Sequence, residues 1–353
     1  MSAMEFSPRQ AQTEQLTVHV LWMTSGLGCD GDTVAMTAAT SPSFEDLIGR
    51  TIPGMPGVAI YNPFLAVENG EDFMRAWYDA AAGKLEPFIL VLEGAVPNEE
   101  INGDGHWAAL GVDPVSGQPI TTNEWIDRLA PRAAVVLAVG TCATYGGIPA
   151  MKNNPTGAMG LRDYLGRSWR SKIGLPIVNL PGCPAQPDNI TETLLYLVLQ
   201  VAGTTQPIVL DDQGRPAWLF EHTAHEVCNR AGFADHGDYA DQLGDDSRCL
   251  VKFGCKGPVV KCNVPARGWI NGIGGCPNVG GICMACTMPG FPDKYLPLMD
   301  TGPKGKVVAA ASRFAYGPLL KQLRNQSIKR RYDVEPAWRK PGAELASGYK
   351  PRW

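Results

Sequence analysis

The chain has 353 residues, ten cysteines, a hydrophobic fraction of 44% and a formal net charge of -4. This length suits about two domains, and the composition suits a globular protein. The longest apolar run, about seven residues ending at Val139, excludes a spanning helix, which needs roughly 20. The first fifteen residues contain no apolar signal core and no twin-arginine pair, so we expect a cytoplasmic protein without an export signal or a membrane anchor of its own.

The elements predicted along the chain are typical of an α/β sheet. Short apolar runs predict buried strands at Leu16–Met23, Val58–Tyr61, Phe88–Leu92, Ala134–Val139 and Pro176–Leu180. Helical patterns lie between them, for example at Glu71–Ala82 and Thr122–Leu129. Strands that alternate with helices predict a parallel, doubly wound sheet, and continuously apolar strands predict that helices cover both of its faces.

The character of the sequence changes after about residue 206, where Gly, Pro and Cys become frequent. We therefore expect a disordered N-terminus over 1–15, a sheet domain over 16–205, a small irregular domain over 206–300 and a basic arm over 301–353. The arm holds 12 Lys/Arg and 3 Asp/Glu, a net charge of +9, which leaves -13 for residues 1–300. Such asymmetry suits docking on a partner, or equally a solvated tail. No nucleic-acid motif accompanies it.

A first group of cysteines follows three of the predicted strands. Cys29 lies in the Gly-rich loop after the first strand, Cys142 follows AVVLAVGT, and Cys183 follows PIVNLPG. Open α/β sheets bind ligands beyond the carboxyl ends of their strands, so these cysteines are expected to converge. In a reducing compartment they are metal ligands rather than disulfides. Thiolates are the usual ligands of iron–sulfur clusters, and we expect a cluster here.

A fourth ligand for this first group is Asp32, within Cys29-Asp30-Gly31-Asp32. A Cys-x-x-Cys loop would place a thiolate at that position, and a carboxylate would bind a cluster iron through oxygen as a harder ligand. Asp32 also suits a turn, and Asp30 is a weaker substitute ligand. A three-iron cluster held by the three cysteines alone is the remaining alternative.

The second group consists of His225, Cys228, Cys249 and Cys255. The HxxC spacing places His225 and Cys228 on one face of a helix or tight turn. Three cysteines and one histidine suit an iron–sulfur cluster in which histidine replaces a thiolate, and they also suit zinc. His222 is the rival histidine, at a poorer offset from Cys228.

The third group contains Cys262, Cys276, Cys283 and Cys286, the last two as a CxxC. Four thiolates complete a 4Fe-4S cluster, or alternatively a zinc site. Together the three groups use all ten cysteines. Three clusters in one protein would form a path for electrons, so electron transfer is the function that the cysteine pattern predicts.

The motifs resemble those of the small, electron-transferring subunit of nickel–iron hydrogenases. The resemblance covers about residues 16–300 and rests on several motifs in the family's order. The matching stretches are LEGAVP (92–97), GTCATYGG (140–147), PGCP (181–184), HxxC (225–228), CLVKFGCKGP (249–258) and CMACTMPGFPD (283–293). The resemblance implies a flavodoxin-like domain followed by a small irregular cluster domain.

The resemblance also implies a role for each group. The first group would hold the cluster proximal to the catalytic metals, Cys283 and Cys286 the medial cluster, and the second group the distal cluster. Hydrogen would be oxidised at a nickel–iron centre in a separate large subunit. Electrons would pass through three clusters, 4Fe-4S or 3Fe-4S, to an acceptor such as a quinone or a further subunit. A higher oligomer, peripheral at the membrane through its partners, is expected.

Three departures from the family pattern stand out. The usual ECTGC loop is here Gly28-Cys29-Asp30-Gly31-Asp32, so an aspartate occupies the second cysteine position. The common medial cysteine is replaced by Val264, with Cys262 two residues earlier, and Cys276-Pro277 stands where many relatives have Trp-Pro. The medial cluster is therefore either four-iron, or three-iron without Cys262 or Cys276. The combination is most similar to the actinobacterial-type, oxygen-insensitive uptake branch.

Two other functions are compatible with parts of the sequence. A cluster subunit of the complex I family shares the flavodoxin-like domain and would be a quinone-linked module with one cluster. A scaffold stapled by zinc would use the second and third groups, but would leave Cys142 and Cys183 at strand ends unexplained.

Overall fold

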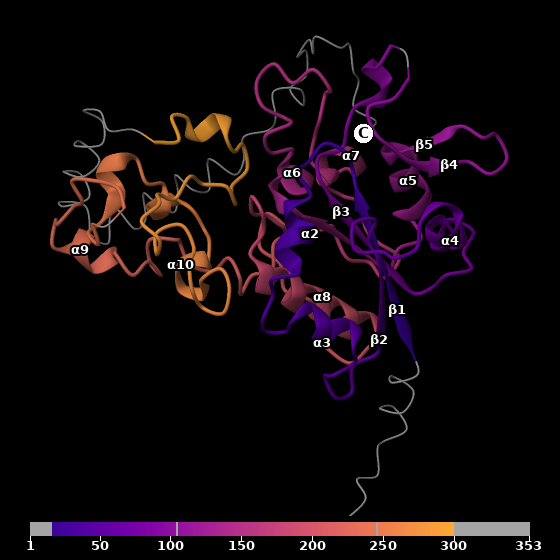
Figure 1. Cartoon of the computed structure of the whole chain (residues 1–353), viewed down its shortest axis with the longest axis horizontal. Helices are drawn as coiled ribbons and strands as arrows, with labels where there is room; N and C mark the ends of the chain where they lie inside the picture. The colour runs from indigo at the N-terminus through magenta and orange to yellow at the C-terminus, as the bar shows by residue number, and fades with distance from the viewer. Residues whose placement is uncertain (1–15, 104, 245, 300–353) are drawn as a thin grey trace, which may run out of the picture.

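A computed structural model describes residues 16–103, 105–244 and 246–299. In Figure 1 the N-terminal α/β part, indigo to magenta, lies to one side of a C-terminal part with few regular elements, drawn in orange. The predicted N-terminal segment 1–15 and the basic arm 301–353 lie outside the described residues. No helix among the described residues is both long and apolar enough to cross a membrane.

The described residues form a five-stranded parallel sheet in the order β2-β1-β3-β6-β7. Its strands are β1 (Thr17–Thr24), β2 (Gly57–Tyr61), β3 (Phe88–Glu93), β6 (Val135–Val139) and β7 (Val178–Leu180). The reversal of strand order beside β1 is that of a doubly wound, flavodoxin-like sheet. The predicted fold class and all five predicted strands are confirmed, with ends shifted by one or two residues.

Helices cover both faces of the sheet because the strands are apolar on both sides. Leu90 and Leu92 of β3 pack in one core with Trp77 and Trp125, whereas Val91 packs in the opposite core. The first core lies under α4 (Gly70–Ala81) and α5 (Thr122–Leu129), as predicted, and the second lies under α2 (Gly31–Met36), α3 (Phe44–Ile48) and α8 (Pro187–Val201). The sheet is therefore the middle layer of three (Figure 1).

Shorter elements complete the sheet domain at the carboxyl ends of the strands. Helix α6 (Gly140–Tyr145) begins directly after β6, and α7 (Leu161–Leu165) packs beside it. The short helix η1 (Glu99–Ile101) is followed by a hairpin of β4 (Ala109–Val112) and β5 (Pro119–Thr121), which leads into α5. The loops at this edge and the start of α6 carry the first cysteine group.

The C-terminal part has few regular elements, as predicted. They are η2 (Leu250–Phe253), η3 (Gly257–Val259), α9 (Ala231–Asp235), α10 (Val264–Arg267) and η4 (Asp293–Tyr295). A small core includes Val260, Met288, Phe291 and Tyr295. Two further small clusters of buried side chains lie in this part. Cysteines pack among the apolar side chains in all three.

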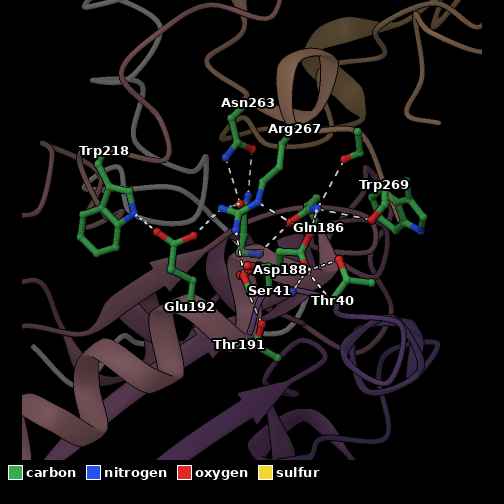
Figure 2. A network of polar contacts seen from close by, with 12 residues as sticks. Thr40, Ser41, Gln186, Asp188, Thr191, Glu192, Trp218, Asn263, Arg267 and Trp269 are labelled. Atoms are coloured by element: carbon green, nitrogen blue, oxygen red, sulfur yellow. Dashed lines mark hydrogen bonds and ion pairs between the residues drawn. The ribbon is translucent and has the colours of Figure 1, made fainter. Parts of the chain in front are cut away.

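A polar network joins α8 to α10 (Figure 2). Arg267 donates to Asn189 Oδ1 at 3.0 Å and forms ion pairs with Glu192 and, at 3.8 Å, with Asp188. Asn189 and Asn263 exchange hydrogen bonds at 2.9 Å. Buried charged groups need such partners, so this network fixes how the C-terminal part sits on the sheet domain.

Candidate iron–sulfur sites at three cysteine groups

The first cysteine group gathers where three strands end, as predicted. Cys29 follows β1, Cys142 lies in the first turn of α6, and Cys183 follows β7. The thiols are close enough to affect one another. Burial and the nearby Cys183 raise the pKa of Cys142 to about 12, and burial and Cys29 raise that of Cys183. Cys29 and Cys183 are exposed, so this group lies at the molecular surface.

Glycines bring the backbone close to the sulfur atoms of this group. A Cβ at Gly31 would lie 3.0 Å from Cys29 Sγ, and a Cβ at Gly147, whose φ is +54°, would lie 2.9 Å from Cys142 Sγ. Any side chain at either position would crowd the sulfur. The backbone is folded closely around the group, as expected for loops that enclose an inorganic cluster.

Asp32 lies in the first turn of α2 with only 7% of its surface exposed. Its Oδ1 accepts a hydrogen bond from the Ala185 N–H at 2.7 Å, two residues beyond Cys183. Its Oδ2 lies against Gly140, where a Cβ would approach to 2.0 Å. Burial, and secondarily the charge of Glu93, raise the pKa of Asp32 to about 8. A cation bound at this carboxyl would replace the proton and offset the cost of burying the negative charge.

Glu93, at the carboxyl end of β3, holds the loop that carries Asp32. Its buried carboxylate accepts hydrogen bonds from the Asp32 N–H at 2.8 Å, the Thr33 N–H at 3.1 Å and the Trp22 indole N–H at 2.9 Å. The Thr33 hydroxyl donates to it as well. These bonds satisfy N–H groups that are otherwise unpaired at the start of a helix. Glu93 therefore fixes α2 beside the first group.

The second group lines one small cavity, together with Arg230 and Pro277. The four predicted residues His225, Cys228, Cys249 and Cys255 all contribute to its wall. His225 and Cys228 share a tight turn, in which the Cys228 N–H donates to the His225 carbonyl at 3.1 Å. Thr223 and Glu226 stabilise this turn through reciprocal side-chain to backbone hydrogen bonds.

Arg230 brings a buried positive charge to the second group. Its backbone N–H donates to Cys228 Sγ at 3.4 Å. Its guanidinium donates to the carbonyls of Pro277 and Arg248 at 2.8 Å, and to that of Asp246. The charge of Arg230 opposes the effect of burial, which raises the pKa values of Cys228 and Cys249. Hydrogen bonds to sulfur and nearby charges are the usual means of tuning a cluster's potential.

All four cysteines of the third group line a second cavity. Cys262, Cys276, Cys283 and Cys286 surround it with Phe220, Val260 and other apolar side chains. Cys262 and Cys276, of which the sequence allowed one to be left out, both belong to this wall. Val264, which stands where the family pattern has a cysteine, also lines this cavity. Burial raises the pKa values of all four thiols, Cys262 to about 12, so they need a metal to be thiolates at neutral pH.

The three groups are arranged in series, with the third in the middle. Cys183 of the first group lines the cavity of the third and lies close enough to Cys286 to influence the pKa of its thiol. At the opposite side Cys283 lines both cavities, and its N–H donates to Cys255 Sγ of the second group at 3.4 Å. In the described ranges no three His, Cys, Asp or Glu side chains lie close enough together to hold a single metal ion.

Comparisons with known proteins match both parts of the chain. Residues 29–197 match the family described as NADH ubiquinone oxidoreductase, 20 Kd subunit, and residues 220–299 match the family described as the C-terminal part of the NiFe/NiFeSe hydrogenase small subunit. The periplasmic NiFeSe hydrogenase small subunit of Desulfomicrobium baculatum is 32% identical over 79% of this chain and 85% of its own length. The chain belongs to the small subunits of nickel–iron hydrogenases. It is thus the smaller part of a heteromeric oxidoreductase and pairs with a large catalytic subunit.

Two further relatives of this hydrogenase small subunit agree. The hydrogenase-2 small chain of Escherichia coli K12 is 29% identical, over 77% of this chain and 67% of its own length. The solved actinobacterial-type NiFe-hydrogenase from Ralstonia eutropha H16 is 54% identical. That alignment covers 98% of this chain and 100% of the solved chain, with a TM-score of 0.82. The predicted resemblance to the hydrogenase small subunits, and its actinobacterial-type form, are confirmed.

Sequence reasoning assigned no role to three residues that the structure places at the sites of this small subunit. Glu93 could have been found as a charged residue at the end of an apolar strand, a position that usually faces a ligand. Arg230, in HEVCNR, is a basic residue two positions after a predicted ligand. Thr141, beside Cys142, gives no signal of its own, because its partners are distant in sequence.

Proposed function

We propose that this small subunit transfers electrons from the large subunit to an acceptor through three iron–sulfur clusters, in the order first, third and second group. The serial arrangement of the groups is the observation that supports this most directly. Each neighbouring pair shares a cavity wall or a hydrogen bond between a backbone N–H and a cysteine sulfur. Bound clusters would supply one-electron redox chemistry at each group.

The residues of each site suit a cluster of four irons. The third group would hold one through four cysteines, and the second through His225 and three cysteines. The first would hold one through Cys29, Cys142, Cys183 and Asp32, whose buried carboxyl is fixed beside the cysteines. In this assignment Cys262 and Cys276 are both ligands, because both line the cavity that Cys283 and Cys286 line.

The exposure of the sites indicates where the partners bind. Cys29 and Cys183 are exposed, so the first group would face the large subunit, in which the family carries the nickel–iron centre. The second group, at the other end of the series, would deliver electrons to a quinone or to a further subunit. The 54% identity to an actinobacterial-type enzyme supports hydrogen oxidation in the oxygen-insensitive branch.

The complex I alternative is less well supported. The family described as NADH ubiquinone oxidoreductase, 20 Kd subunit, matches residues 29–197, which contain only the first group. The hydrogenase small-subunit family matches residues 220–299, which contain the second and third groups. A module with one cluster leaves these seven cysteines and His225 without a role.

The proposal predicts the metal content of the complex purified with its large subunit. Three four-iron clusters correspond to about twelve iron and twelve acid-labile sulfide per small subunit. Metal analysis, sulfide assay and EPR-monitored redox titration would measure them, and the large subunit would carry nickel. Iron for a single cluster would favour the complex I alternative, and zinc without labile sulfide would contradict the proposal.

A further inference from the structure

Thr141 is a buried residue between two of the cysteine groups. It precedes Cys142 in the first turn of α6 and is only 2% exposed. Its N–H donates to the Gly182 carbonyl at 2.7 Å, and its hydroxyl accepts from the Gly182 N–H at 3.1 Å. Gly182 precedes Cys183. One residue therefore binds the two loops that carry Cys142 and Cys183.

The same hydroxyl also contacts the third group. It donates a hydrogen bond to the carbonyl of Cys286, which lies 145 residues further along the chain. A hydroxyl has one donor and two acceptor positions, so it can serve both partners at once. Cys183 and Cys286 also line the same cavity. Through its bonds to Gly182 and to Cys286, Thr141 thus holds Cys286 against the first group.

We propose that the Thr141 hydroxyl fixes the first group against the third for electron transfer between them. It also provides a hydrogen-bonded bridge between the two groups. The inference rests on the proposed relay function. In the step, a cluster held by Cys29, Cys142 and Cys183 would be oxidised by one electron, and a cluster held by Cys286 and its neighbours would be reduced by it. The hydroxyl keeps its proton, and no bond of the protein is formed or broken.

The bridge should matter because electronic coupling depends steeply on the separation of the sites and on the bonds between them. Without the hydroxyl, the Gly182 N–H and the Cys286 carbonyl would lose their partner, and the two loops could separate. Groups that orient metal ligands from behind typically affect activity by 10–100-fold, so we expect a rate loss of roughly tenfold.

The test compares Thr141→Val with Thr141→Ser in the purified complex. Valine keeps the shape but removes the hydroxyl, and serine keeps the hydroxyl. Thr144→Val is a matched control, because Thr144 is an equally buried residue of α6 whose hydroxyl bonds to the Gly140 and Thr141 carbonyls. For each variant we would measure iron content, EPR coupling between clusters and hydrogen oxidation with an artificial acceptor. We would also measure the exchange of hydrogen isotopes between dihydrogen gas and water, which the large subunit catalyses without the relay.

Thr141→Val should slow acceptor reduction roughly tenfold and change the EPR coupling, while isotope exchange stays at the wild-type rate. Thr141→Ser and Thr144→Val should behave as wild type. Wild-type rates and coupling in Thr141→Val, or equal losses in the serine variant, would overturn the proposal. If Thr141→Val loses iron, Thr141→Ala supplies the same comparison. A wild-type complex without three clusters would instead refute the proposed relay itself.

Discussion

Asp32 is a buried carboxyl that is costly to ionise, and we propose it as a ligand of the first cluster. Its carboxyl is buried beside Glu93, which raises its pKa to about 8. A lone carboxylate in such a place is unfavourable unless a cation or a proton compensates it. The Ala185 N–H holds Oδ1 in position, and α2 is held by Glu93. Iron bound at Asp32 would supply the compensating positive charge.

Replacing Asp32 with cysteine tests this ligand role. A thiolate donates more electron density to iron than a carboxylate, so it should favour the oxidised cluster and lower its reduction potential. We expect Asp32→Cys to lower the potential of the first cluster by about 60 mV, a tenfold change in a one-electron equilibrium. The measurement is an EPR-monitored redox titration, with oxygen tolerance assayed in parallel.

Asp30→Asn is the control for this substitution. It removes a neighbouring carboxylate, and asparagine tolerates the left-handed backbone of residue 30, whose φ is +54°. We expect little change in the potential. Titration curves and EPR spectra of Asp32→Cys that match the wild type would refute the assignment of Asp32 as a ligand.

Glu93 gives a second prediction for single residues. Glutamine has the same shape but only one acceptor oxygen, so Glu93→Gln would direct an amide N–H₂ toward donors from Trp22 and Thr33. Mismatched buried donors cost about 1–3 kcal/mol. We expect a lower melting temperature and faster loss of iron from the first site on dilution. Glu86→Gln, at an ion pair that is half exposed, should change neither, and equal effects in both variants would contradict the role of Glu93.

The contact between α8 and α10 determines how the third group lies against the sheet. Asn263 and Arg267 come from the segment that follows Cys262, and their partners Asn189 and Glu192 lie in α8, which follows Cys183. Gln186 adds hydrogen bonds to the Gly268 and Trp269 carbonyls (Figure 2). The segments that carry Cys183 and Cys262 therefore each continue into one side of the same network.

Arg267→Leu should weaken this network. It leaves Asp188 and Glu192 without their guanidinium in a partly buried place, at an expected cost of about 1–3 kcal/mol and a fall in melting temperature of about 3 °C or more. Thermal unfolding of the purified complex, followed by the visible absorption of the clusters, is the measurement.

Arg75→Leu is the matched control for Arg267→Leu. Arg75 forms an ion pair with Asp72 in which both side chains are more than 70% exposed, and such pairs contribute little to stability. We expect its melting temperature to stay close to that of the wild type. Equal shifts in the two variants would show that the network of Figure 2 is not important for stability.

The molecule as a whole shows how much of a relay can be predicted from sequence. The apolar strands place Cys29, Cys142 and Cys183 at one edge of a sheet, and the structure confirms this convergence. The HxxC spacing likewise places His225 and Cys228 in one turn. These predictions succeed because strand order and short spacings are local properties of the chain.

Other features depend on contacts that no local pattern encodes. Whether Cys262 and Cys276 both reach the third site depends on how irregular loops fold, and those loops have no periodicity to read. The serial order of the groups requires the meeting of Cys183 with Cys286 and of Cys255 with Cys283. Helix α8 is also hard to predict, because its apolar residues 194–199 equally suit a strand.

The exposure of Cys29 and Cys183 has a consequence for maturation. In a newly made small subunit, iron bound at these two cysteines would be open to water and oxidants, whereas Cys262 of the third group is buried. The large subunit would then cover this end of the molecule. Damage to the first site would therefore be fastest after metal is loaded and before the large subunit binds.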